Sequence, residues 1–243
     1  MTNIRKENFK IRSYEMDAQG KASVQTICNY LQEIAGLHAA ALGVSVTDLI
    51  RNKMTWVLSR LHLIIDRYPE WSEDVHVETW PSGAKGLYAT RDFTISDAGN
   101  NIIGVATSSW MIVDLVKQKP IELPEFVHAI ILPDKKRAID DPFKKLHGPK
   151  RMDFEKQFNV RRSDLDINQH VNNVNYIEWA VESTPLDIYR KKNLTELEIS
   201  FRAESKYGDR IIAQSEIHED ICLHKLTRSD DGRELAVVKT RWD

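Results

Sequence analysis

The sequence predicts an α+β protein made of two similar halves. In the first half, we expect a short strand over residues 9–16, and residues 22–42 then carry apolar side chains every three or four positions, which is one face of a helix. Alternating apolar and polar residues follow, and they predict antiparallel strands over residues 54–66, 74–80, 87–96 and 102–114. We expect Pro81, Ser82 and Gly83 to form a turn. One helix followed by several antiparallel strands is typical of an α+β domain.

The same order of elements returns in the second half. The expected elements are a strand, a helix and four further strands, over residues 158–162, 171–183, 196–204, 210–217, 221–228 and 234–242. The halves align at an offset of 149 residues, which places Asn168 opposite Gln19 and His170 opposite Lys21. Only the second half therefore keeps an amide and an imidazole. We expect one active site per chain, with the first half free to shape a substrate pocket.

A segment rich in proline and charged residues separates the halves. It breaks the helix and strand patterns, and we assign residues 131–151 to a linker. The expected domains are residues 1–130, which form the pocket, and residues 152–243, which hold the catalytic residues.

The composition fits a soluble globular protein and argues against several other classes. Of the 243 residues, 42% are hydrophobic and 29% are charged, and the net charge of −2 gives no general attraction to nucleic acid. No apolar run approaches the roughly 18 residues of a membrane span, and the first residues lack the apolar core of a signal peptide. The two cysteines, Cys28 and Cys222, favour a reducing compartment, so we expect a cytoplasmic protein.

A cluster of polar side chains precedes the second predicted helix. Asp166, Asn168 and His170 alternate along the chain, and alternate residues of an extended loop point the same way. One pocket can then hold a base, an orienting group and an oxyanion donor. We expect the helix to begin near or just after His170, with its unpaired N–H groups directed at this cluster. The alternative is that Asp166 or Asn168 only caps the helix and that His170 is an ordinary packed side chain.

These residues also carry a family resemblance. The segment DLDINQHVNNVNYIEW, residues 164–179, resembles the C-terminal signature of the plant plastid fatty acyl–acyl-carrier-protein (acyl-ACP) thioesterases and their bacterial relatives. Residues 11–33, 56–71 and 108–114 extend the resemblance over most of the chain. It implies tandem hotdog domains, each a central helix wrapped by an antiparallel sheet. It also implies a bacterial enzyme that hydrolyses fatty acyl-ACP without a metal or another cofactor.

The resemblance implies a role for each residue of the cluster. The family pairs the Asp-x-Asn-x-His motif with a glutamate on a following strand, which matches Glu204 in SFRAES. We expect Glu204 and His170 to position and deprotonate a water molecule, Asn168 to hold the carbonyl or the water, and Asp166 to orient the loop. The plant enzymes carry a cysteine where this chain has Ser205. A serine needs a dedicated base, so direct attack by water is favoured.

Two further sets of residues are expected to contact the substrate. Ile27, Leu31 and Ile34 lie on the apolar face of the first helix, and we expect them to line the acyl-chain pocket. The acyl carrier protein is acidic, and the basic run Lys135, Lys136 and Arg137 is the expected contact for it. A solvated surface is the alternative for this basic run.

Several alternatives remain open at this level. An acyl-CoA thioesterase of the same fold, a hotdog dehydratase and a non-catalytic acyl-binding module all fit the fold. His218, Cys222 and His224 fall on one predicted strand face and could bind zinc. The chain is either a monomeric pseudo-dimer or part of a homodimer.

Overall fold

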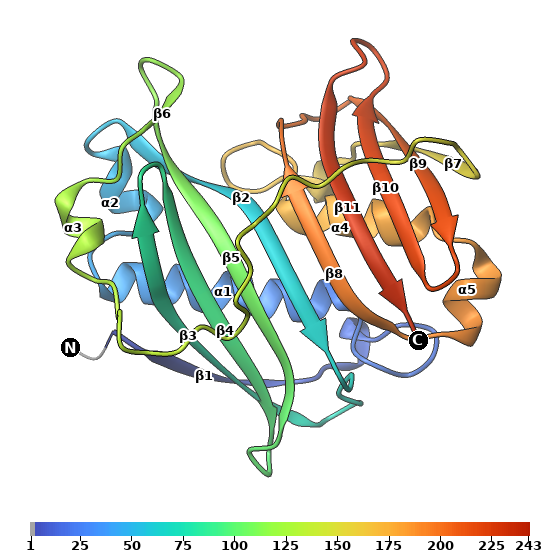
Figure 1. The fold of residues 1–243 in the computed structure, drawn as a ribbon, viewed down its shortest axis with the longest axis horizontal. Coiled ribbons are helices and arrows are strands. Elements are labelled where there is room, and N and C mark those ends of the chain that lie inside the picture. Colours follow the sequence, from blue (N-terminus) through green and yellow to red (C-terminus); the bar gives the residue numbers. More distant parts are fainter. Residues whose placement is uncertain (1–2) are drawn as a thin grey trace. The chain divides into compact units, whose positions relative to one another are not determined.

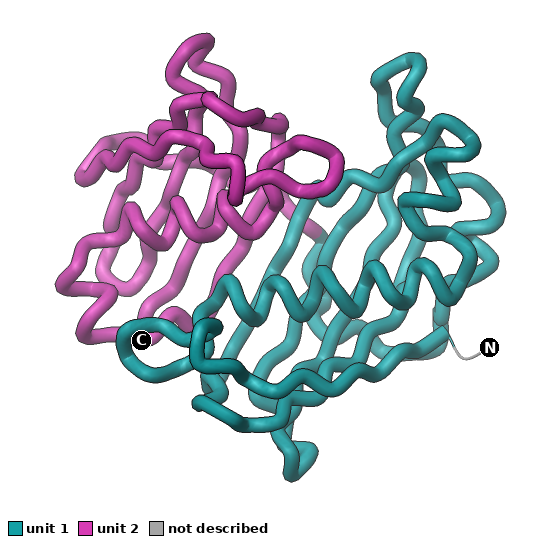
Figure 2. The backbone as a smooth tube through the Cα atoms, turned by 180° about the vertical axis from the view of Figure 1, so that it is seen from behind, with its two compact units in different colours: residues 1–142 teal, residues 143–243 magenta. Residues whose placement is uncertain are grey.

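The computed structural model describes residues 3–243 and divides the chain into two compact units, residues 1–142 and residues 143–243 (Figure 2). In each unit a long helix packs on an antiparallel sheet (Figure 1). The predicted linker, residues 131–151, is divided between the two units, and its first half packs onto unit 1.

Unit 1 holds six strands and three α-helices among its described residues. In chain order they are β1 (Arg5–Lys10), α1 (Val24–Ala41), α2 (Val46–Ile50), β2 (Met54–Ile65), β3 (Asp74–Lys85), β4 (Tyr88–Asp97), β5 (Ile102–Asp114), β6 (Lys119–Ile121) and α3 (Glu125–His128). Unit 2 repeats the plan with β7 (Phe154–Asn159), α4 (Asn173–Glu182), α5 (Leu186–Lys191), β8 (Leu194–Phe201), β9 (Arg210–His218), β10 (Ile221–Arg228) and β11 (Glu234–Trp242).

The strand order shows that the two units share one topology. The main sheet of unit 1 runs β1-β3-β4-β5-β2, with β6 added beside β5. The sheet of unit 2 runs β7-β9-β10-β11-β8. Numbered from one to five within each unit, both sheets have the order 1-3-4-5-2. The expected α+β fold with a duplicated domain is therefore confirmed.

The predicted strand over residues 9–16 is wrong in its bounds, since β1 ends at Lys10 and residues 13–15 form a 3-10 turn.

The first helix forms where the apolar pattern places it. The hydroxyl of Ser23 caps α1 by accepting a hydrogen bond from the N–H of Thr26, at 3.1 Å. The helix ends at Leu42 and Gly43, where glycine adopts a φ of +71°. Its apolar face is buried against β1 and β3, which makes α1 the centre of the unit 1 core.

The predicted turn at Pro81, Ser82 and Gly83 is wrong, because β3 continues through these residues. The neighbouring strand β1 pairs with β3 only as far as Thr79. Pro81 lies beyond this point, so its missing N–H group costs no hydrogen bond to β1. The β3–β4 register shifts between Pro81 and Gly83. A side chain at Gly83 would meet the Thr90 hydroxyl at 2.7 Å, so glycine is required for this close approach.

No helix in the described part of the chain is both long enough and apolar enough to cross a membrane.

A fully buried histidine in unit 2 removes the zinc alternative. The ring nitrogen Nδ1 of His224 lies 2.9 Å from the Ser215 hydroxyl, and Nε2 lies 3.0 Å from the Thr240 hydroxyl. His218 is exposed and contacts Glu216 at 2.8 Å. Because both nitrogens of His224 already have partners in the core, His224 is not available as a ligand and the zinc alternative is excluded.

The buried histidines predict a loss of stability in acid. Burial lowers the pKa of His224 to about 3, and burial with the nearby Arg91 lowers that of His38 to about 4. Both values lie below the ordinary 6.5, so the unfolded chain binds protons more readily and stability falls as the pH drops below 6.5. Between pH 7 and pH 5 each histidine should cost about 2 kcal/mol. Urea unfolding at the two pH values measures this loss.

A His128→Gln variant is the control for this experiment, because His128 is exposed and has no carboxylate partner among the described residues, so its replacement should leave the pH dependence nearly unchanged. Equal unfolding free energies at pH 5 and pH 7 would contradict the account of the buried histidines.

Candidate active site

The predicted polar cluster forms a closed loop held by one carboxylate. Oδ1 of Asp166 accepts hydrogen bonds from the N–H groups of Asn168, at 2.8 Å, and His170, at 3.1 Å. The N–H of Asp166 donates to the carbonyl of His170 at 2.7 Å. Gln169 adopts a φ of +65°, which lets the chain reverse. Asp166 therefore shapes the loop through its backbone contacts, as expected for an orienting residue.

Unit 1 contains the same loop with different side chains. Oδ1 of Asp17 accepts from the N–H groups of Gln19, at 2.8 Å, and Lys21, at 3.1 Å. The N–H of Asp17 donates to the Lys21 carbonyl at 2.7 Å, and Gly20 has a φ of +80°. The loop is thus common architecture, and the two units differ in the groups that it presents.

Helix α4 begins later than expected and has a different cap. It starts at Asn173, and Asn172 caps it by accepting a hydrogen bond from the Val174 N–H at 3.2 Å. The alternative in which Asp166 or Asn168 caps this helix is therefore wrong.

The first N–H groups before α4 are already occupied. The N–H of Val171 donates to the Ser205 carbonyl at 3.0 Å, and that of Asn172 donates to the Asp164 carbonyl at 2.8 Å. Neither is free to stabilise an oxyanion, so the expected contribution of these two N–H groups is excluded, and the Asn168 side chain is a candidate donor. Asn168 is exposed, and its side-chain amide has no hydrogen-bond partner among residues 3–243.

Asp164 fixes the loop to the helix that follows it. Its buried carboxylate accepts from the Arg161 N–H at 2.7 Å and from the Arg161 guanidinium at 2.8 Å. Its carbonyl accepts from the Asn175 side chain at 2.8 Å, besides the Asn172 N–H. The sequence pattern does not single out Asp164 or Asn175. Only Asn172 carries a readable signal, because asparagine is favoured at helix N-caps.

A bend in the chain after β8 brings Glu204 to His170. The predicted strand over residues 196–204 is too long, since β8 ends at Phe201. The N–H groups of Arg202 and Ala203 both donate to the Leu235 carbonyl, at 2.8 and 3.3 Å. Two residues after β8 then pair with one residue of β11, as in a β-bulge. The side chains beyond this point no longer alternate between the two faces of the sheet.

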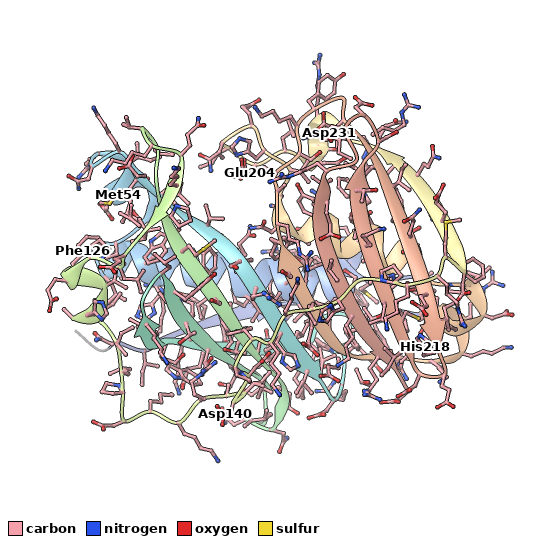
Figure 3. The ribbon with its side chains drawn as sticks, turned by 45° about the horizontal axis from the view of Figure 1, so that its top comes forward. Met54, Phe126, Asp140, Glu204, His218 and Asp231 are labelled. Atoms are coloured by element: carbon pink, nitrogen blue, oxygen red, sulfur yellow. The ribbon has the colours of Figure 1, made fainter. Side chains whose placement is uncertain are left out.

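The bend places the two expected catalytic side chains side by side. Nε2 of His170 lies 3.4 Å from Oε2 of Glu204, and their side chains are 34% and 57% exposed. Figure 3 shows Glu204 at the same end of the unit 2 strands as Asp231, with His218 at the other end. At 3.4 Å the contact is longer than a typical N–H···O hydrogen bond, so a small rotation makes or opens it. Both groups are accessible to solvent.

Ser205 points into the protein instead of joining this pair. It is fully buried, and its hydroxyl donates to Oδ2 of Asp209 at 2.7 Å. Burial raises the pKa of Asp209, but hydrogen bonds from Ser205, Lys206 and Arg228 outweigh this and hold it below its ordinary value. A carboxylate held in its ionised form is a poor base, so nothing here activates Ser205 as a nucleophile.

The three residues predicted to line the acyl pocket are buried in unit 1. Ile27, Leu31 and Ile34 are each at most 3% exposed, and they lie along one face of α1. Their role in binding an acyl chain stays a prediction.

Two of the three basic residues predicted to bind the carrier have partners within unit 1. Arg137 pairs with the fully buried carboxylate of Asp92, its Nε lying 2.8 Å from Oδ2. Lys135 pairs with Glu78, and its ammonium lies 4.1 Å from the centre of the Trp80 ring. Lys136 is exposed, so it alone of the three has no structural contact in the described residues.

The duplicated loop allows a controlled test of Asp166. Replacing Asp166 by alanine leaves two backbone N–H groups without their acceptor, which should destabilise the protein by about 1–2 kcal/mol. Asp17→Ala removes the same two hydrogen bonds in unit 1 and should cost a similar amount. Only Asp166→Ala should also lower the rate of the reaction at the candidate site, because only that loop presents Asn168 and His170. Equal turnover in the two variants would show that Asp166 does not position the site.

The fold and the site together define a class of protein. Each unit is an α+β domain of the hotdog type, a central helix against an antiparallel sheet, and only unit 2 presents the amide–imidazole loop. The chain belongs to the acyl-ACP thioesterase family: the profile of the acyl-ACP thioesterase N-terminal domain matches residues 2–131, and that of the C-terminal domain matches residues 147–243.

Curated relatives and solved structures agree with this family. The chain is 34% identical to a chloroplastic palmitoyl-acyl carrier protein thioesterase of Gossypium hirsutum, over 97% of this chain and 63% of the relative. It is 32% identical to a chloroplastic oleoyl-acyl carrier protein thioesterase of Coriandrum sativum, over 98% of this chain and 69% of the relative. The chain thus spans just under two thirds of the first relative.

Among solved structures, the crystal structure of an acyl-ACP thioesterase from Bacteroides thetaiotaomicron is 27% identical to this chain. It superposes with a TM-score of 0.89 over 99% of this chain and 98% of that one.

Proposed function

We propose that this protein hydrolyses the thioester of a fatty acyl-ACP, releasing the free fatty acid and the carrier in fatty acid biosynthesis. The observation that carries the proposal is the contact of His170 with Glu204, on a loop whose copy in unit 1 has Lys21 instead of the imidazole. Two relatives, a palmitoyl- and an oleoyl-acyl carrier protein thioesterase, support the same substrate class.

The proposed reaction uses a water molecule held by this pair. The carboxylate of Glu204 and the imidazole of His170 accept the proton of the water as its oxygen attacks the thioester carbonyl carbon. The Asn168 amide donates to the carbonyl oxygen as negative charge develops there. The C–S bond then breaks and the thiolate of the carrier leaves. The proton held by the pair is transferred to this thiolate, which becomes a thiol.

Thiol release from a panel of acyl-ACPs tests the proposal. Saturable release, faster from acyl-ACP than from the matching acyl-CoA, is the expected result. Faster release from acyl-CoA would identify a CoA thioesterase of the same fold. Acyl binding without any thiol release would make the protein a non-catalytic acyl-binding module, and both results would contradict the proposal.

The first helix predicts how chain length is selected. Replacing Leu31 or Ile27 by phenylalanine would shorten a pocket lined by α1, so the product profile should shift to shorter fatty acids. One methylene in such a pocket is worth about 1–3 kcal/mol, which is enough to reorder neighbouring chain lengths. Product analysis by gas chromatography measures the shift, and thermal unfolding of each variant controls for overpacking. An unchanged profile in folded variants would assign the acyl chain to other walls.

Location and assembly stay predictions. Both cysteines are free and buried, which suits the proposed bacterial cytoplasm. Whether the duplicated chain acts as a monomer or a homodimer is a question for sedimentation analysis.

A further inference from the structure

The cations near the catalytic loop fall into two groups. Two are held by carboxylates: Arg161 by Asp164 at 2.8 Å, and Arg228 by Asp231 at 2.7 Å. Such paired charges add little to the attraction of an approaching partner, because the adjacent opposite charge cancels most of their field at distances larger than the pair itself.

Two other cations beside the loop are exposed and unpaired. Arg162 and Lys206 have no carboxylate partner among the described residues. The Arg162 guanidinium instead lies over the ring of Tyr207, 5.4 Å from its centre. This contact joins the segment before the catalytic loop to the segment that carries Glu204. Lys206 follows Glu204 by two residues.

Exposed apolar side chains accompany these cations. Ile167, within the catalytic loop, is 92% exposed, and Tyr207 is 57% exposed. Arg162 and Ile167 lie on one of the two segments that this contact joins, and Lys206 and Tyr207 lie on the other; we call these four residues the loop-side patch, and they present positive charge without carboxylate partners together with apolar groups. Apolar groups beside accessible charge are typical of a protein-binding surface.

We propose that the loop-side patch docks the acidic surface of the acyl carrier protein, in place of the basic run at Lys135, Lys136 and Arg137. The inference rests on the proposed function, since it names where that substrate's carrier binds. Two observations favour it. The predicted run keeps only one cation without a structural partner, whereas the loop-side patch has two. The patch also adjoins the His170–Glu204 pair, which the thioester must reach.

Charge reversal tests the docking surface. In Arg162→Glu/Lys206→Glu, KM for acyl-ACP should rise at least about tenfold, because like charges would then face each other across the interface. Turnover of the matching acyl-pantetheine, which lacks the carrier and the phosphate, should stay unchanged. Rising salt should raise KM for acyl-ACP in the wild type and have less effect in the variant.

A matched control is available in the same unit. Arg190 and Lys191 are exposed on α5, which follows the C-terminal end of α4, whereas the catalytic loop precedes its N-terminal end. Arg190→Glu/Lys191→Glu makes the same change in net charge and should leave KM for acyl-ACP near the wild-type value. An equal rise in KM in both double variants would overturn the proposal, since it would reflect total charge and not this patch.

The remaining outcomes separate the docking surface from the proposed function. An unchanged KM in Arg162→Glu/Lys206→Glu, with normal acyl-ACP hydrolysis, overturns the docking surface alone. A KM that rises equally for acyl-CoA would show that the patch binds the phosphate of the arm and not the carrier protein. Binding of unacylated carrier to the wild type, measured by calorimetry, tests docking without turnover. Weaker binding in the double variant supports the patch even if hydrolysis fails, and no binding to the wild type overturns it.

Discussion

Replacing His170 by alanine should lower kcat for acyl-ACP hydrolysis at least ~10²-fold, the usual effect of losing a general base. The imidazole is the group that faces Glu204, at 3.4 Å, and no other side chain in the loop can accept a proton as readily. The variant should remain folded, because the side chain is partly exposed and the loop is closed by backbone groups that alanine retains.

Lys21→Ala is the matched control for this loss. Lys21 occupies the equivalent position in unit 1, and its backbone makes the same two hydrogen bonds with Asp17. Its replacement should leave kcat near the wild-type value. Thiol-release rates and circular dichroism of both variants give the comparison. Near-normal turnover in a folded His170→Ala protein would remove the imidazole from the mechanism.

Glu204 and Ser205 should respond in opposite ways to substitution. Glu204→Ala should lose most activity, at least ~10²-fold in kcat, because the carboxylate beside His170 is removed. Glu204→Gln should behave similarly, since it keeps the shape of the side chain but cannot accept a proton. Ser205→Ala should keep most of kcat, because the hydroxyl is buried and directed at Asp209.

The stability of these variants should show the reverse order. Ser205→Ala removes one of the hydrogen-bond donors to the partly buried carboxylate of Asp209, at a cost of about 1–2 kcal/mol. The exposed side chain of Glu204 should cost little when it is replaced. Urea unfolding and kcat, measured on the same preparations, give both quantities. An inactive but stable Ser205→Ala protein would contradict this division of roles.

Much of the architecture could be predicted from local sequence patterns. The helical face of residues 22–42 and the alternating strands depend on neighbours within a few positions, and the structure confirms the helix and the strand content. The offset of 149 residues also holds in three dimensions, since Asp17 and Asp166 close the same loop. The assignment of the candidate site to unit 2 depends on the side chains of Asn168 and His170 alone. Because the two loops have the same backbone hydrogen bonds, their geometry does not distinguish the two units.

The features that the sequence did not reveal depend on contacts between distant residues. Arg137 belongs to a charged run, but its position is set by buried Asp92, which lies 45 residues earlier. The bend that aims Glu204 depends on the carbonyl of Leu235, which is on another strand. Pro81 stays within a strand only because the neighbouring strand has already ended. Sequence patterns and composition describe single segments, whereas each of these three features depends on a second segment that is distant in the sequence.

Intact-protein mass spectrometry during turnover tests most directly the claim that the His170–Glu204 pair activates water without a covalent intermediate. Wild-type protein is mixed with excess acyl-ACP and quenched in acid while fatty acid is still being released. The account predicts that the protein keeps its unmodified mass throughout, and that Ser205→Ala gives the same result with similar product formation. A mass increase equal to the acyl group, located on Ser205 and absent from an inactive Ser205→Ala protein, would contradict it.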